Sequence, residues 1–160
     1  MSFDSFARDN LPPREEWPVF RHSITYPARL NCAVELLDRN LAQRADHPAV
    51  VTPDETLSYA QLAERVDRIA HVLVKETGLV PGNRVLLRSA NNAWMVAAYF
   101  AVLKAGGVVV ATMPLLRAKE LGEILRKARI THAICDARLR GELDRADAPE
   151  LRHRLHWGDG

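Results

Sequence analysis

Several features that mark whole classes of protein are scarce or missing in this sequence. Its two cysteines, Cys32 and Cys135, lie far apart, and neither belongs to a CxxC pair or has a partner at metal-ligand spacing. This usage is typical of a reduced, intracellular protein, and Cys135, which lies within an apolar run, should be buried. Residues 1–10 contain no apolar segment of the kind found in signal peptides. We therefore expect a cytoplasmic protein.

Long hydrophobic runs and an excess of one charge are missing as well. The longest apolar run, 95–103, is too short to span a bilayer, so we expect no membrane partner. The 22 basic and 20 acidic side chains nearly cancel, and the basic ones are scattered, so we expect no nucleic-acid partner. With 160 residues, 48% of them hydrophobic, the chain is large enough for one compact domain with its own core.

Local signatures of several enzyme classes are also missing. The sequence contains no GxxxxGK(S/T) phosphate loop, no GxGxxG segment after a strand and no GxSxG nucleophile turn. His153 and His156 have the spacing of a histidine pair, but no carboxylate or thiolate partner accompanies them. We therefore predict exposed histidines there and no metal site.

The first segment of the chain, by contrast, is rich in proline. Because proline fixes φ and lacks a backbone donor, residues 1–30 are predicted to form an extended arm rather than a helix. Large apolar residues are interspersed among the prolines, which suggests an arm that lies across a larger body. The expected anchors are Leu11, Trp17, Phe20 and Tyr26.

The following segment should form two helices with a short hairpin between them. Asn31 suits the N-cap of the first helix, which we expect to end near residue 44. Short apolar runs at 49–51 and 56–58, separated by a turn, predict two strands. Ser58 and Gln61 have the spacing of a capping box, and apolar residues then recur with helical periodicity to about residue 76.

The rest of the sequence alternates strands and helices, which predicts an α/β fold. The apolar runs of strand length predict strands that are buried on both faces. Such strands favour a parallel sheet with right-handed crossovers. The helix over 92–104 is apolar almost all round and needs more neighbours than these elements supply. We therefore expect an incomplete parallel sheet with flanking helices; a partner-binding role for this helix is the alternative. The expected strands are 84–88, 108–112 and 132–135, and the other helix is 118–128.

Polar residues follow these strands at the edge where open parallel sheets bind ligands. The polar residues are Ser89, Asn91, Thr112 and Asp136, and Pro114 lies at the same edge. Each also suits a structural role, as a helix cap or a turn residue, and we favour that interpretation.

Three segments together resemble the adenylate-forming superfamily of acyl- and aryl-CoA ligases, luciferases and peptide-synthetase adenylation domains. They are TLSYAQL at 56–62, PGNRV at 81–85 and AVLKAGG at 101–107. Three others are similar to 2-aminobenzoate-CoA ligase and benzoate-CoA ligase: LPPREEWP at 11–18, SANNAWM at 89–95 and ATMPLLR at 111–117. The resemblance implies that 31–160 is the N-terminal part of an AMP-binding domain, preceded by the arm 1–30.

This resemblance implies a ligase reaction in two steps, with an aryl carboxylic acid, ATP, Mg²⁺ and CoA as the reactants. The acid would first form an acyl-adenylate, and CoA would then form the thioester. The family supplies the chemistry from a phosphate loop, an acidic ribose contact and a C-terminal lysine, none of which occurs in this sequence. We therefore assign no catalytic residue and expect this chain to be inactive alone. The alternatives are another acyl-CoA synthetase, such as a fatty acyl-CoA ligase, or a free-standing, non-catalytic α/β binding module.

One binding residue follows from the resemblance. Some aryl-CoA ligases place an arginine directly after the proline that follows the second strand, where it meets a CoA phosphate. Here that position is Leu115, and Arg117 lies two residues later. Because a guanidinium pairs well with phosphate, we predict that Arg117 contacts CoA. The alternative is a solvated arginine at the start of a helix.

Overall fold

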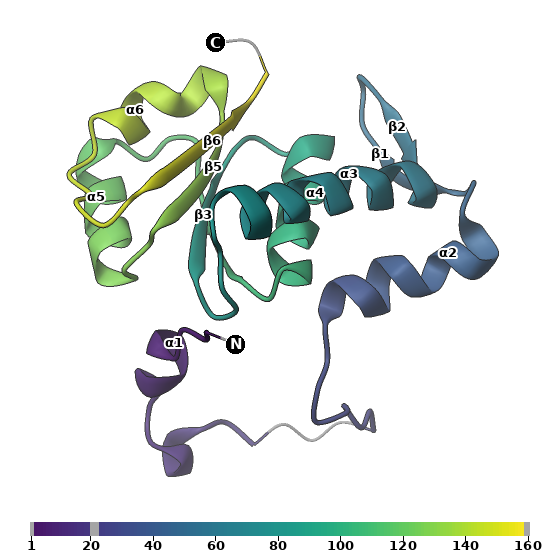
Figure 1. Ribbon diagram of the computed structural model, residues 1–160, viewed down its shortest axis with the longest axis horizontal. Coiled ribbons are helices and arrows are strands. Elements are labelled where there is room, and N and C mark those ends of the chain that lie inside the picture. Colours follow the sequence, from purple (N-terminus) through teal and green to yellow (C-terminus); the bar gives the residue numbers. More distant parts are fainter. Residues whose placement is uncertain (1, 20–22, 159–160) are drawn as a thin grey trace.

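A four-stranded sheet lies between layers of helices (Figure 1). The computed structural model describes residues 2–19 and 23–158. The strand order is β4-β3-β5-β6, and every neighbouring pair is parallel. The predicted α/β class is therefore confirmed. The bounds of the strands are β3 (Arg84–Arg88), β4 (Val108–Thr112), β5 (His132–Asp136) and β6 (His153–Trp157).

Alternating side chains of the central strand β3 build two cores. Leu86 packs on one face with residues of α5 (Ala118–Lys127) and α6 (Arg140–Asp144), the latter preceded by the short 3-10 turn η4 (Ala137–Leu139). Val85 and Leu87 pack on the other face against α4 (Ala93–Lys104). Successive strand residues point to opposite faces, so a strand buried on both sides must be apolar throughout its middle.

Helix α4 is covered in turn by an outer layer. This layer contains α3 (Tyr59–His71) and the antiparallel hairpin of β1 (Pro48–Val51) and β2 (Thr56–Ser58). The predicted capping box is present: Ser58 Oγ accepts from the Gln61 amide at 3.2 Å, and Gln61 Oε1 accepts from the Ser58 amide at 2.9 Å. Because α4 lies between α3 and the sheet, the sequence interpretation of a mostly buried helix is confirmed.

The helix that precedes the hairpin and helix α3 each contain a wider, π-type turn, which the sequence did not predict. The first helix includes η2 (Val34–Asp38) before α2 (Arg39–Arg44), and α3 continues into η3 (Val72–Glu76). Asn31 Oδ1 accepts from the Ala33 amide at 3.0 Å, as its predicted capping role requires. A π turn shifts the buried face by part of a turn, and Leu37 is accordingly buried while Val34 is 37% exposed.

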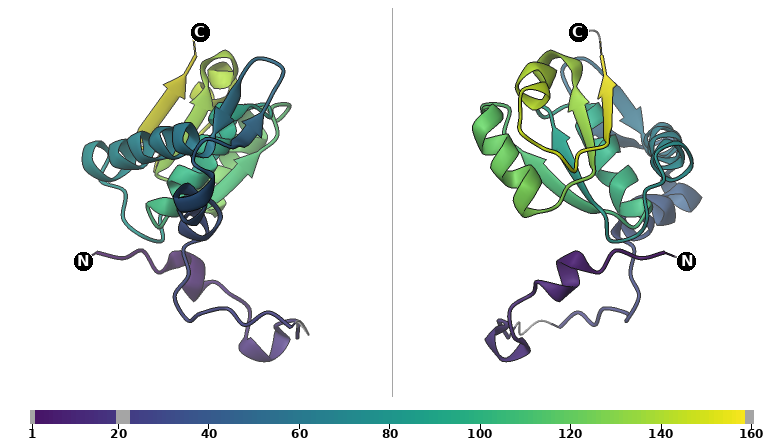
Figure 2. Two further views of the ribbon diagram at one scale, coloured as in Figure 1. Left: turned by 90° about the vertical axis from the view of Figure 1, so that its right-hand side faces the viewer. Right: turned by 60° about the vertical axis from the view of Figure 1, so that its left-hand side comes forward.

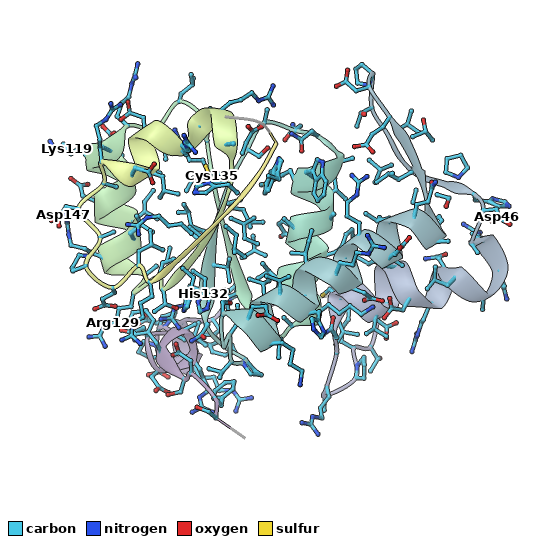
Figure 3. The ribbon with its side chains drawn as sticks, turned by 45° about the horizontal axis from the view of Figure 1, so that its top comes forward. Asp46, Lys119, Arg129, His132, Cys135 and Asp147 are labelled. Atoms are coloured by element: carbon cyan, nitrogen blue, oxygen red, sulfur yellow. The ribbon has the colours of Figure 1, made fainter. Side chains whose placement is uncertain are left out.

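The fourth strand is a correction to the predicted sheet. The sequence predicted three strands and no element over 153–157, but β6 pairs with β5 over its whole length. Its burial alternates, with His153, Leu155 and Trp157 half-buried and the residues between them exposed. Alternation of this kind is what an edge strand shows. Figure 3 labels His132 and Cys135, which lie toward opposite ends of β5, the neighbour of β6.

The N-terminal arm runs below the α/β body, past the amino-terminal ends of the strands (Figure 2). It is not extended throughout, because α1 (Phe6–Asp9) and one 3-10 turn, η1 (Arg14–Glu16), interrupt it. The predicted apolar anchors Leu11, Trp17 and Tyr26 are 51%, 44% and 60% exposed. Phe20 lies outside the described residues. Asp4 and Phe6 attach the start of the arm to the α/β body, where both contact Arg84.

Candidate functional site

The strand ends predicted from the sequence do meet at one edge of the sheet. In the register of the strands, Arg88 lies beside Thr112 on one side and Cys135 on the other. Asp136 lies beside Trp157 in the next pair. Ligands of open parallel sheets bind outside this carboxyl edge, so it is the first place to look for a site.

Most of the polar residues at this edge are engaged in local structure. The Asn92 side chain accepts from the Met95 amide at 2.8 Å and caps α4, while Thr112 Oγ1 donates to the Leu87 carbonyl at 3.1 Å. Asp136 accepts from the amide and guanidinium of Arg138, and these hydrogen bonds lower the pKa of the Asp136 carboxyl. For Thr112 and Asp136 the favoured structural interpretation is confirmed, and the residue that caps α4 is Asn92, the neighbour of Asn91.

An open cleft of about 380 Å³ lies above the ends of β5 and β6. One wall is the turn of the hairpin, and another is a stack of rings: Trp94 and Trp157 have centroids 6.4 Å apart and planes 17° from parallel. The Arg65 guanidinium lies 4.4 Å from the Trp94 ring centroid. Arg65 also donates two hydrogen bonds to Glu55, which fixes its plane over the ring. The cleft thus has an aromatic wall, and charged residues line it as well: Asp54, Glu55, Asp136 and Arg138.

Arg117, the predicted CoA contact, lies at the N-cap position of α5 near this edge. Its side chain is 78% exposed, and Nη1 donates to Glu142 Oε1 at 3.3 Å. Its backbone amide donates to Glu120, and the Ala118 amide donates to Glu142 at 2.9 Å. The hydrogen bond from Ala118, followed by that from Arg145, lowers the pKa of the Glu142 carboxyl. Carboxylates therefore occupy the first amides of α5, and the exposed guanidinium remains as the group available to an anion.

Arg88 is the residue at this edge that the sequence analysis missed. It is 1% exposed, and it donates hydrogen bonds to backbone carbonyls of the loop between β4 and α5. The sequence did contain a signal for this role. An arginine at the end of a strand that is buried on both faces must find hydrogen-bond acceptors for its donors inside the protein.

The histidine pair does not form a metal site. His153 and His156 are three residues apart on β6, so their side chains leave opposite faces of the strand. His153 stacks on His132, with ring centroids 4.7 Å apart. Within residues 2–19 and 23–158, no three His, Cys, Asp or Glu side chains gather as metal ligands do. None of the helices in the same ranges has the length and apolar content needed to cross a membrane.

A parallel sheet between layers of helices, with a cleft at its carboxyl edge, defines an α/β domain of the open-sheet class, and comparison with known proteins identifies the family. Residues 37–157 match the AMP-binding enzymes, so most of the chain is covered. The chain belongs to this family of adenylate-forming ligases, as the resemblance implied.

Curated relatives come from several branches of the family. The chain is 38% identical to a salicyl-AMP ligase/salicyl-S-ArCP synthetase of Mycobacterium tuberculosis over 64% of its own length and 19% of the relative's. It is 35% identical to a long-chain-fatty-acid–CoA ligase of Escherichia coli over 59% of its length and 17% of that ligase. The chain thus spans about a fifth or less of these relatives.

Solved structures show the same fold. An anthranilate CoA ligase, AuaEII, in complex with anthranoyl-AMP aligns with a TM-score of 0.78 and 30% identity over 83% of this chain and 26% of that one. A benzoate CoA ligase from Burkholderia xenovorans aligns with a TM-score of 0.73 and 23% identity over 81% of this chain and 26% of that one. Anthranilate is 2-aminobenzoate, so both aryl-CoA ligase types named by the resemblance are among the neighbours.

Proposed function

We propose that this chain is the N-terminal part of an aryl acid–CoA ligase that acts on 2-aminobenzoate or a close relative. The observation that carries the proposal is the similarity to the anthranilate CoA ligase, which extends over 83% of the chain at 30% identity. Residues 1–30 would then form the arm and 31–160 the first part of the AMP-binding domain. A cytoplasmic location stays a prediction.

The proposed reaction proceeds in two steps, and most of its chemistry would come from outside this chain. The carboxylate attacks the α-phosphorus of ATP and releases pyrophosphate; the CoA thiol then attacks the acyl-adenylate and releases AMP. Charge develops at phosphorus in the first step, so Mg²⁺ and fixed cations are needed there. The phosphate loop and lysine that the family uses are not among these residues. The present segment would supply the sheet edge that supports the site, and alone it should be inactive.

Within this segment, Arg117 would contact a phosphate group of CoA. Its exposed guanidinium is permanently charged and carries several donors, of which one is engaged with Glu142. Lys119 is the matched control, because it is an exposed cation on the same helix (Figure 3). In the natural protein that contains this segment, Arg117→Ala should raise the KM for CoA about tenfold, while Lys119→Ala should leave it within about twofold. An unchanged KM for CoA in Arg117→Ala would rule out the contact.

One of the two alternatives has its own support. Similarity to a long-chain-fatty-acid–CoA ligase, 35% identical over 95 residues, favours a fatty acid as substrate. A free-standing binding module would follow if no catalytic residues accompany the chain in the cell. Residues that select the acid in this family are not among those that this segment would contribute.

The deciding experiment has two parts. The first is the intact mass of the natural protein, detected through a peptide of this chain; a mass several times 17.9 kDa supports the ligase, and 17.9 kDa supports a binding module. The second is the release of AMP by the natural protein with ATP, Mg²⁺ and CoA, compared among 2-aminobenzoate, benzoate, salicylate and a long-chain fatty acid. We expect the highest kcat/KM with 2-aminobenzoate; a preference for the fatty acid would replace the proposal with the first alternative.

A further inference from the structure

Arg88 makes four hydrogen bonds, and all four acceptors are backbone carbonyls. Nη1 donates to Met113 at 3.0 Å, and Nη2 donates to both Pro114 and Leu116 at 2.9 Å. Nε donates to Leu139 at 3.3 Å. Three of the acceptors belong to the loop that joins β4 to α5, and the fourth belongs to the turn η4 before α6. One side chain therefore holds two separate segments at the carboxyl edge of the sheet.

The surroundings of this guanidinium are unusual for a buried charge. Buried cations are normally paired with carboxylates, because removing a charge from water is costly. In the parts of the chain that the structure describes, no carboxylate makes an ion pair with Arg88. Carbonyl dipoles alone face its donors. Only arginine offers five donors in one rigid plane, so no other side chain can bind these four carbonyls at once.

Each of the two segments that Arg88 holds adjoins a part of the Arg117 environment. The loop at 113–116 ends at Arg117, the first residue before α5. The segment after Leu139 carries Glu142, whose carboxylate accepts from the Arg117 side chain and from the Ala118 amide. The backbone and the ion-pair partner of Arg117 are thus both fixed by the same buried side chain.

We infer that Arg88 is a positioning residue that fixes the β4–α5 loop and, through it, the place of Arg117 at the carboxyl edge. The fixing of the loop stands on the hydrogen bonds of this chain alone. Its consequence for CoA rests on the proposed function.

The test compares amide hydrogen exchange in this chain and in two variants. Arg88→Lys keeps the charge but lacks the planar fork, whereas Arg88→Met removes the charge as well and so remains testable if a buried lysine prevents folding. In either variant, amides at 113, 115–118 and 137–142 should exchange about tenfold faster or more, while amides of β3 and β5 change little. Uniform acceleration over the whole sheet, or no acceleration, would overturn the inference.

Leu125→Ala is the matched control. Leu125 is 1% exposed and belongs to the core cluster against which Leu116 packs, but its side chain has no donor that could bind the carbonyls that Arg88 holds. This variant should lower the protection of the sheet and the loop together, as a global loss of stability does. A selective effect on 113–118 in Leu125→Ala as well would show that the loop responds to any core defect, and it would overturn a special role for Arg88.

Kinetics of the natural protein separate this inference from the proposed function. Arg88→Met should raise the KM for CoA about as much as Arg117→Ala does, and the double variant should be no worse than either, since both act at one place. The adenylation step, followed by ATP–pyrophosphate exchange without CoA, should change less than twofold in each variant. Suppose that amide exchange in the variants is accelerated selectively in the loop but Arg117→Ala leaves the KM for CoA unchanged. The positioning role of Arg88 is then supported, and the contact of Arg117 with CoA is ruled out. If the acceleration of exchange is not selective for the loop, the positioning role of Arg88 is ruled out, whatever the value of the KM for CoA.

Discussion

Asp4 and Arg84 lie 80 residues apart in the chain, yet they form an ion pair at the amino-terminal end of the sheet. Arg84 is almost fully buried and also donates to the carbonyls of Gly82, Ala128 and Arg129. The centroid of the Phe6 ring lies 4.7 Å from the guanidinium of Arg84 and 5.1 Å from the guanidinium of Arg129. Figure 3 labels Arg129 next to α1. We call Asp4 and Phe6, with these partners, the N-terminal clasp.

Breaking the ion pair of the clasp should destabilise the fold. Asp4→Asn leaves Arg84 its carbonyl partners, so we expect a loss of roughly 1–3 kcal/mol, less than for an arginine left entirely without acceptors. Urea denaturation measures the change. Asp9→Asn is the control, because Asp9 is an exposed aspartate of α1 and its loss should stay within about 0.5 kcal/mol. Equal effects of the two substitutions would contradict a specific clasp.

The contribution of Asp4 should also depend on pH. Burial raises the pKa of the Asp4 carboxyl, but hydrogen bonds from the Phe6 amide, Arg84 and Asn83 outweigh burial and lower it overall. A carboxyl with a lowered pKa stabilises the fold above its unfolded pKa, and this stabilisation is lost as the pH falls through the folded pKa. The difference in stability between the wild type and Asp4→Asn should therefore be full at pH 6 and shrink below about pH 4. A difference that stays constant to pH 3 would contradict this.

Two glycines offer a matched test of how closely the clasp approaches the sheet. Gly82 has φ +90°, and a Cβ there would lie 1.9 Å from the Asp4 carbonyl oxygen; Gly78 has φ +69°, and a Cβ there would meet nothing within 4 Å. Gly78→Ala should cost roughly 1 kcal/mol of backbone strain. Gly82→Ala should cost at least about 2 kcal/mol more, because it must also displace the clasp. Combining Gly82→Ala with Asp4→Asn should then give less than the sum of the two losses.

The elements with strong local signals were predictable from the sequence. The capping residues Asn31 and Ser58 fixed the starts of two helices, because each satisfies an amide within its own first turn. The strand β6 was missed, since its alternation of half-buried and exposed residues is short and carries two histidines and an arginine. The π turns were missed because the helices were predicted from apolar residues spaced at 3.6 residues per turn. One wider turn changes that spacing too little to be detected.

The site was less predictable than the fold, for a physical reason. Arg84 and Arg88 are the first and last residues of β3. Charged residues at strand ends are commonly exposed, but both of these are buried. Their acceptors lie 25 to 51 residues away for Arg88 and up to 80 residues away for Arg84. Pairings at such separations depend on how the layers pack and leave no local pattern. Arg117 is a CoA contact only by prediction from the resemblance, and its pairing with Glu142 became visible only in the structure.

The two cysteines should differ sharply in reactivity. Cys135 is fully buried, and burial, opposed by the nearby charge of Arg88, raises the pKa of its thiol to about 11. Because the thiolate is the nucleophile, Cys135 should resist iodoacetamide at pH 8 in the folded chain. Cys32 is exposed and should react there. Mass spectrometry should detect one label on the native protein and two in urea; labelling of Cys135 before unfolding would contradict its inert burial.

His132 should make the fold sensitive to mild acid. Its Nε2 lies 3.2 Å from the Thr77 carbonyl, which only accepts, so Nε2 carries the hydrogen and Nδ1 accepts from Thr131 Oγ1 at 2.7 Å. This neutral ring stacks on His153. Burial lowers the pKa of His132, and the nearby charges of His153 and Arg152 lower it further, against the opposite effect of the Thr77 carbonyl.

A histidine whose pKa is lowered by folding binds its proton more readily in the unfolded chain. Stability is therefore complete above the unfolded pKa of about 6.5 and falls as the pH drops below it, until the folded ring is protonated too. The urea midpoint of the wild type should fall more between pH 7.5 and pH 5 than that of His132→Gln, although the variant is less stable at pH 7.5. His156→Gln, on the exposed face of β6, should keep the wild-type slope. If His132→Gln keeps that slope as well, the acid sensitivity has another source.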